Sequence, residues 1–222
     1  MNAEKVYKVA SAALLGHCKE ISKTSEEAEK LYDRVSKDPE AYATRPVLSQ
    51  LGCLARDALE EIAKKEGKGS VLSACKAIIK NASREDMQGA WIDQSGWQNV
   101  CDGFRAIRIR NHLDMLPTAA GIDMNNVWAI YSKEVDASLV LPSIGEVKAH
   151  IAAEKASGKT DRDITWDFGA GKPQVKAKWL IDLLQSGVGD TAMYAQNKGH
   201  LSHIYACGEG VEALLLPVRK SR

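Results

Sequence analysis

The chain has 222 residues, of which 45% are hydrophobic and 27% are charged, and its formal net charge is +1. This composition is typical of a globular protein with a substantial core and excludes a wholly disordered chain. A net charge near zero provides no overall field that would draw the protein to nucleic acid or to an anionic membrane.

Neither a membrane-spanning segment nor a signal peptide is recognisable in the sequence. No apolar run approaches the roughly 18 residues that a spanning helix needs, and charged residues interrupt the first amphipathic stretch. The five cysteines are odd in number and widely spaced, as expected for reduced, buried thiols. We therefore expect a soluble, cytoplasmic protein that does not contact a membrane.

Helices dominate the predicted elements of the first half of the chain. Apolar periodicity predicts a first helix over residues 6–21, and Thr24 with Glu27 forms a capping-box pattern for a second. Pro46 occupies the favoured first turn of a third helix. Ser70 can cap a fourth.

The same signals continue further along the chain. A long fifth helix is predicted to precede a sixth, which begins after Asp123. Ser143 and Glu146 form another capping-box pattern, for a helix that ends near Lys155. The pattern therefore remains helical to about residue 155.

The C-terminal part of the chain is less regular. Residues 156–163 form the best linker candidate, Pro173 begins a further helix, and residues 211–218 fit either a helix or a strand. We find no internal repeat. We therefore expect an all-α fold, in which a bundle of five or six helices over residues 1–155 is followed by a smaller, mainly helical segment over residues 156–222.

The candidate functional residues lie on the fifth helix, which is predicted from Trp97 to about Met115. At about 100° per residue, Arg105, Arg108 and His112 fall within roughly 60° of one another at the edge of its apolar stripe. An imidazole can transfer a proton near neutral pH, and a guanidinium offers paired donors to a phosphate. Together they favour metal-independent RNA cleavage.

This segment resembles the HEPN superfamily, helical bundles in which an arginine and a histidine separated by four to six residues form a ribonuclease site. Six residues separate Arg105 from His112, and three separate Arg108 from it. Arg110 and Asn111 supply the arginine–polar dipeptide that often occurs in the family.

The sequence His112-Leu113-Asp114 is also similar to the phage-abortive-infection branch of this superfamily. The resemblance extends in arrangement over roughly residues 45–135. It implies an all-α fold, a ribonuclease site without metal, and two protomers whose motifs face each other.

The leading hypothesis is a HEPN-like ribonuclease, or a ribonuclease-derived toxin or defence protein, that acts on RNA as a homodimer without a cofactor. His112 is then the general base or acid, and Arg108 or Arg105 is the phosphate clamp. Asn111 orients these groups, and Arg110 contacts the nucleic acid.

Two hypotheses from other classes remain open: a non-enzymatic helical adaptor or regulatory domain that binds another protein, and a nucleic-acid-binding protein without catalysis. The spacing of His200, His203 and Cys207 would place them on one face of a helix, where they could bind a zinc ion. No fourth ligand pattern accompanies them, so we expect no metal.

Overall fold

The computed structural model of the chain describes Asp57 and residues 59–218. The chain divides into two compact units, Met1–Gly69 and Ser70–Arg222. In the first unit, residues 59–65 are helical. The helices predicted over residues 6–21 and after Thr24, and the start of the third, lie outside the described residues.

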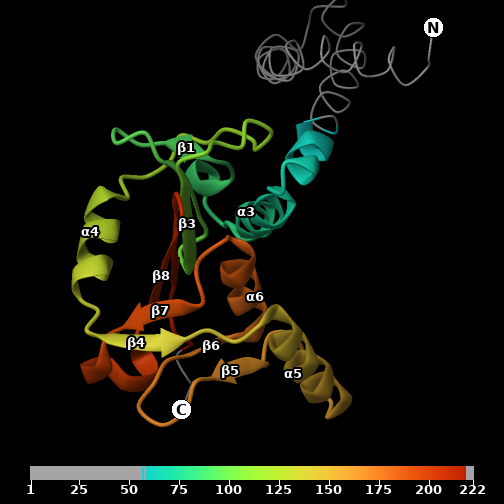
Figure 1. Cartoon of the computed structure of the whole chain (residues 1–222), viewed down its shortest axis with the longest axis vertical. Coiled ribbons are helices and arrows are strands. Elements are labelled where there is room, and N and C mark those ends of the chain that lie inside the picture. The colour runs from blue at the N-terminus through green and yellow to red at the C-terminus, as the bar shows by residue number, and fades with distance from the viewer. Residues whose placement is uncertain (1–56, 58, 219–222) are drawn as a thin grey trace, which may run out of the picture. The chain divides into compact units, whose positions relative to one another are not determined.

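The all-α prediction is wrong, because a seven-stranded antiparallel sheet with the order β1-β2-β3-β9-β8-β7-β4 forms the centre of the second unit (Figure 1). Its strands in chain order are β1 (Trp91–Ile92), β2 (Gln98–Cys101), β3 (Arg105–Ile109), β4 (Ala137–Val140), β7 (Thr191–Tyr194), β8 (Ile204–Gly208) and β9 (Val211–Leu215). A separate two-stranded sheet pairs β5 (Thr165–Asp167) with β6 (Gln174–Lys176).

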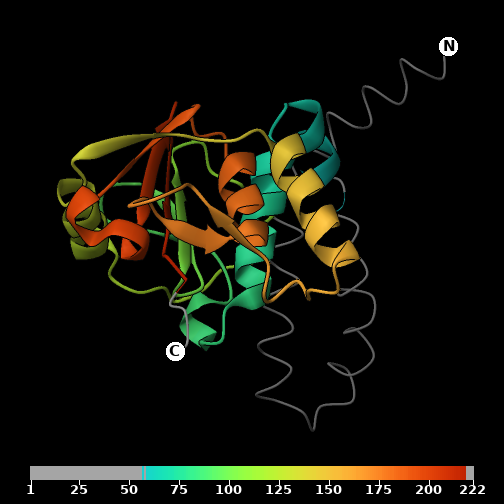
Figure 2. The same cartoon turned by 90° about the horizontal axis from the view of Figure 1, so that it is seen from below.

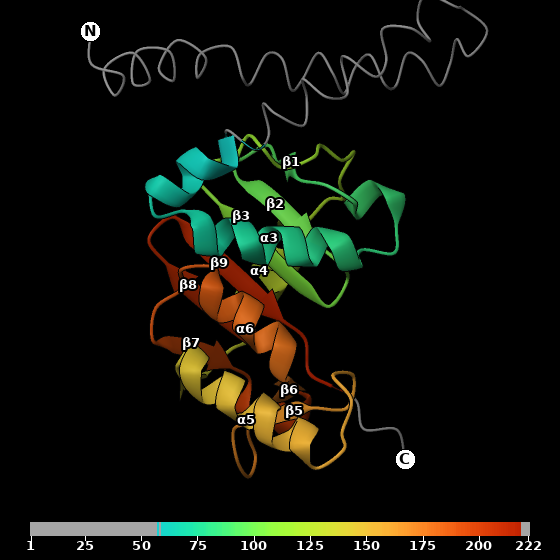
Figure 3. The same cartoon turned by 90° about the vertical axis from the view of Figure 1, so that its right-hand side faces the viewer.

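Helices cover both faces of the large sheet. On one face lie α3 (Gly69–Asn81), α6 (Ala177–Gln185) and α5 (Ile144–Ala156), in that order (Figures 2 and 3). On the other face lies α4 (Asn125–Lys133), as Figure 1 shows. Two short 3-10 helices, η1 (Glu85–Met87) and η2 (Gln196–Leu201), complete the unit. Among the described residues, no helix is long and apolar enough to span a membrane.

Several local predictions are confirmed within this mixed fold. The predicted fourth and sixth helices are α3 and α4. The helix predicted to begin at Pro173 is wrong in its start, because strand β6 follows Pro173 and α6 begins at Ala177. At the start of α5, Glu146 N donates to Ser143 Oγ (3.2 Å), and Ser143 N donates to Glu146 Oε2 (2.7 Å). The capping box was readable because it depends only on residues three apart in sequence. Residues 156–163, the predicted linker, directly follow the body of α5 inside the second unit.

The predicted fifth helix is the main error, because this segment contains the β2–β3 hairpin. Asp102 and Gly103 form its turn: Gly103 has a φ of +89°, and Asp102 N donates to Arg105 O at 3.1 Å. An Asp-Gly pair between apolar, alternating residues is a strong hairpin signal. Residues 211–218, which fitted helix or strand, begin with β9.

The large sheet contains an internal repeat. Each of the two halves runs helix, strand, strand, strand: α3-β1-β2-β3 and α6-β7-β8-β9. Equivalent hairpin residues are 106 positions apart, as the pairs Gln98↔Ile109 and Ile204↔Leu215 show. Since β3 and β9 are antiparallel neighbours, the two hairpins are related by an approximate twofold axis at the centre of the sheet. The prediction of no internal repeat is therefore wrong at the level of structure.

Candidate groove and the predicted site residues

The five residues of the predicted ribonuclease site lie on β3 and in the loop after it. Successive side chains of a strand point to opposite faces of a sheet. Arg105 therefore faces α3 and α6, whereas Arg108 faces α4. The two arginines therefore do not converge on one helical face, as the predicted ribonuclease site requires.

Arg105 is buried in an ionic cluster. Its Nε and Nη2 donate to Asp102 Oδ2 (2.9 and 2.6 Å), and its Nη1 donates to Asp182 of α6. Arg105 is only 3% exposed. Burial raises the pKa of Asp182 to about 6, and the attraction of Arg105 only partly opposes this effect. This guanidinium connects elements of the fold and has little surface left for an external phosphate.

Arg108 is held between two indoles on the other face of the sheet. Its guanidinium carbon lies 4.7 Å from the ring centre of Trp97 and 4.8 Å from that of Trp128. Its Nη2 donates to Glu212 Oε2 at 2.7 Å, and Tyr205 Oη donates to the same oxygen at 2.6 Å. These contacts engage Nη2 and the faces of both neighbouring rings, whereas the buried Nε has no hydrogen-bond partner.

The remaining three predicted residues follow β3 in an accessible loop. Arg110 lies 4.2 Å from the ring centre of Trp97, and its Nη1 donates to the Ser95 carbonyl at 3.1 Å. His112 Nε2 donates to the Gly96 carbonyl at 3.0 Å. Arg110 and His112 thus bind the same turn. Asn111 is exposed, and their proposed catalytic roles stay predictions.

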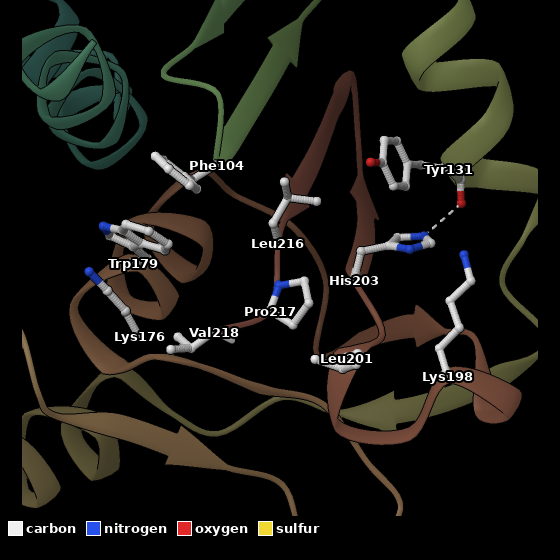
Figure 4. A pocket seen from close by; sticks show the side chains of 10 residues that line it. All are labelled: Phe104, Tyr131, Lys176, Trp179, Lys198, Leu201, His203, Leu216, Pro217 and Val218. Carbon is white, nitrogen blue, oxygen red and sulfur yellow. Dashed lines mark hydrogen bonds between the residues drawn. The ribbon is translucent and has the colours of Figure 1, made fainter. Parts of the chain in front are cut away.

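A cavity of about 630 Å³ lies at the opposite end of the sheet (Figure 4). This is within the range of small-ligand pockets, roughly 300–1,000 Å³. Ten residues line it: Phe104, Tyr131, Lys176, Trp179, Lys198, Leu201, His203, Leu216, Pro217 and Val218. Most of them are apolar or aromatic, and the segment after β9 supplies three.

One wall of the cavity is aromatic and carries a cation. Phe104, from the β2–β3 turn, stacks on Trp179 of α6 with 5.3 Å between ring centres and an angle of 24°. Lys176 Nζ lies 4.6 Å from the Trp179 ring. Phe104 is 55% exposed, so its stacked ring presents a large apolar surface to the cavity (Figure 4).

The opposite wall holds a histidine and a second lysine (Figure 4). His203 Nε2 donates to the Tyr131 carbonyl at 2.9 Å, and the two rings meet edge to face at 4.5 Å. Burial lowers the pKa of His203. Lys198 forms an ion pair with Glu134 beyond α4. This wall therefore anchors the end of α4 to the start of β8.

The segment after β9 separates these two walls and is fixed by its backbone. Leu216 N donates to the Phe104 carbonyl, and Val218 N donates to the Gln174 carbonyl, each at 2.9 Å. A second, more apolar cavity of about 210 Å³ shares Phe104, Tyr131 and Leu216 with the first. The two cavities adjoin at these three residues, and we call them together the β9 groove.

The β9 groove has the character of a binding surface. Among the described residues that line its larger cavity, none is Ser, Thr, Cys, Asp or Glu. The only hydroxyl among these ten lining side chains is that of Tyr131, whose ring packs edge to face on His203. The arrangement suits an apolar ligand with negative charge, because the lysines are at the edges of an apolar surface.

The residues weighed as zinc ligands do not share a helical face. His203 precedes β8, where its buried ring bonds to α4, and Cys207 lies on β8 itself. His200 is in η2. In the part of the chain that the structure describes, no group of three His, Cys, Asp or Glu residues is arranged to hold a metal ion.

Two signals could have located the groove in the sequence. The Asp102-Gly103 pair marks the turn that carries Phe104, and Pro217 within the final apolar run marks the end of a strand. No protein-family model, curated protein or solved structure matches this chain. The function is therefore inferred from the fold and from the geometry of the groove.

Proposed function

We propose that this chain is a non-enzymatic protein-binding domain whose β9 groove binds a short peptide segment with apolar side chains and at least one acidic residue. The observation that carries this proposal is the pair of adjoining apolar cavities that share Phe104, Tyr131 and Leu216. Two neighbouring cavities match two side chains spaced along a peptide, whereas a compact metabolite fills one of them.

Exposed apolar surface at the groove supports this proposal. Phe104 and Leu201, which are 55% and 47% exposed, are two of the six large hydrophobic residues that stand out from the described surface. Contiguous exposed apolar surface in a soluble protein commonly marks an interaction site. Aromatic rings contribute most to such sites because they bury a large area at little cost in conformational entropy.

The charges around the groove favour an acidic peptide. No ion pair of Lys176 occurs among the described residues, and its Nζ lies on the Trp179 ring. Lys198 adds a second positive charge, partly neutralised by Glu134. An apolar surface bordered by two lysines selects against a basic ligand and orients one with a carboxylate.

Selection from a random peptide library displayed on phage tests this proposal with the full-length chain. Peptides that bind should share apolar residues and an acidic residue, and their affinity should fall at least tenfold in Phe104→Ala and Lys176→Glu. Ile92→Ala is the matched control, since Ile92 is 59% exposed on β1 and does not line the groove. Selected peptides that bind all variants equally would exclude the groove as the site.

We infer a reducing compartment such as the cytoplasm, because the three described cysteines are free thiols, of which Cys207 is exposed. Cys75 and Cys101 are buried free thiols, and burial raises the pKa of Cys75 to about 12. Such thiols are inert and suit a reducing environment.

Ribonuclease activity, RNA binding and homodimerisation stay predictions. Incubation of the chain with single-stranded RNA in the absence of metal, beside the His112→Ala variant, tests the first of them. Cleavage that is lost in this variant while its fold is retained would establish the ribonuclease hypothesis and overturn the non-enzymatic assignment.

A further inference from the structure

A buried cluster of three charges lies directly behind the aromatic wall of the β9 groove. Asp102 is saturated: its Oδ1 accepts from Phe104 N (2.9 Å) and Arg105 N (2.8 Å), and its Oδ2 accepts twice from the Arg105 side chain. Arg105 also donates to Asp182 and, at 3.3 Å, to the Ala77 carbonyl of α3. One guanidinium thus joins the turn, α3 and α6.

The cluster carries one excess negative charge when both carboxylates are ionised. Besides Arg105 and Asp102, the charged group that acts on Asp182 is Lys178, which is exposed on α6. The small cavity beside Asp182 is otherwise lined by apolar side chains from α3, β3, α6 and β9. The excess charge is therefore poorly solvated, and Asp182 is the carboxylate that accepts a proton more readily.

The same cluster is connected to the groove through two aromatic residues. Phe104 follows Asp102 in the turn and donates its N–H to that carboxylate. Trp179 precedes Asp182 by nearly one helical turn, and its ring centre is 5.5 Å from the Arg105 guanidinium carbon. A change in the charge of the cluster therefore occurs in direct contact with the wall that these two rings form.

We propose that proton uptake by the Asp102–Arg105–Asp182 cluster strengthens the binding of an acidic peptide in the β9 groove. This inference depends on the proposed function. Asp182 is a positioning residue that does not touch the peptide. As the proton removes the excess negative charge behind the wall, the repulsion that a peptide carboxylate experiences decreases. By reciprocity, the bound peptide makes proton uptake easier.

The direction of the effect follows from the burial of Asp182, which raises its pKa to about 6. At pH 7.5 the cluster is negative, and at pH 5 it is neutral. The carboxylates of the peptide remain largely ionised over this range. An acidic peptide should therefore bind about three- to tenfold more tightly at pH 5 than at pH 7.5.

Titration of the full-length chain with the tightest peptide from the phage selection, labelled with fluorescein, tests the inference between pH 5 and pH 7.5. Asp182→Asn should bind at pH 7.5 about as tightly as the wild type binds at pH 5, with a smaller pH dependence. His203, whose pKa burial lowers, is present in both proteins. Asp190→Asn, at an exposed carboxylate between α6 and β7, is the matched control and should behave as the wild type.

Each outcome of this titration has a distinct meaning. A folded Asp182→Asn variant with the same pH dependence as the wild type would overturn this inference and leave the groove intact as a peptide site. A peptide whose acidic residues are replaced by the corresponding amides should show no Asp182-dependent change in affinity between pH 5 and pH 7.5. If this change remained, the inference would also be overturned. Absence of binding to either protein at every pH would contradict both this inference and the proposed function.

Discussion

The two hairpins of the large sheet have the same register but opposite chemistry at their ends. Beyond β9 the chain continues as Leu216, Pro217 and Val218, which line the β9 groove. Beyond β3 the equivalent positions are Arg110, Asn111 and His112. The equivalent of His203 in the groove is Trp97, which packs against two arginines at the other end.

This comparison shows that the backbone repeat alone does not make a binding site. At the groove end, Phe104 extends from its turn and stacks on Trp179. At the other end its equivalent is Gly210, with a φ of +67°, and a side chain built there would contact Arg110 at 3.5 Å. This separation is an ordinary contact, so the positive φ is what favours glycine here, and this end has no ring that corresponds to Phe104.

The largest expected effect on stability comes from replacing Arg105 of the first hairpin by valine, the residue at the equivalent position of the second. Arg105→Val, which copies Val211, should lower the free energy of unfolding by about 3–5 kcal/mol, because two carboxylates remain buried without their cation. Chemical denaturation measures this loss. The double variant Arg105→Val/Asp182→Leu should recover much of it, and a single variant as stable as the wild type would contradict the role of the cluster.

The pH dependence of the free energy of unfolding distinguishes the wild-type cluster from the Asp182→Asn variant, which has no carboxylate at this position. Because the pKa of Asp182 is raised to about 6 from 3.8, its contribution is fully present below pH 3.8 and is lost as the pH rises through 6. The wild type should therefore lose about 2–3 kcal/mol relative to Asp182→Asn between pH 4 and pH 7. Denaturation curves at both pH values test this, and parallel pH profiles of the two proteins would refute it.

Arg108 provides a smaller test on the other face of the sheet. Arg108→Leu, which copies the equivalent Leu214, should cost about 1–2 kcal/mol, since two cation–π contacts and the pair with Glu212 are lost. Arg110→Leu should change the free energy of unfolding by only about 0.5 kcal/mol, because Arg110 is exposed. If Arg108→Leu and Arg110→Leu lowered the melting temperature equally, the contacts of Arg108 would add no more to stability than those of the exposed Arg110.

The smallest effect on stability is expected at the residue that matters most for binding. Phe104→Gly, which copies Gly210, should lower the free energy of unfolding by less than about 1 kcal/mol, because the ring is half exposed. The same change should remove peptide binding. A large loss of stability in thermal denaturation would assign Phe104 to the core and weaken its role in the groove.

The sequence predicted those elements that depend on local signals. The capping box of Ser143 and Glu146 and the periodicity of α3 and α4 involve residues three or four apart, and all three helices are confirmed. The helix predicted over the β2–β3 segment is wrong because it was based on the helical period of Arg105, Arg108 and His112, whereas the strand places Arg105 and Arg108 on opposite faces. The Asp102-Gly103 turn decides between the two.

The site was not predictable to the same degree. The lining of the β9 groove joins residues as distant as Phe104, Tyr131, Trp179 and Leu216. The pairing of β3 with β9, the packing of α6 and the contact of α4 with His203 bring them together. No spacing along the chain records these contacts. The repeat is also not recognisable in the sequence, because its two halves share a strand register but few identical residues.

The most direct test of the peptide-binding claim is to map the contact surface by amide chemical shifts during titration with a selected peptide. The account predicts that the largest changes occur at Phe104, Lys176, Trp179, Leu216 and Val218, with little change at Trp97, Arg110 and His112. The largest changes at this second set of residues would contradict it and would place the binding surface at the opposite end of the sheet.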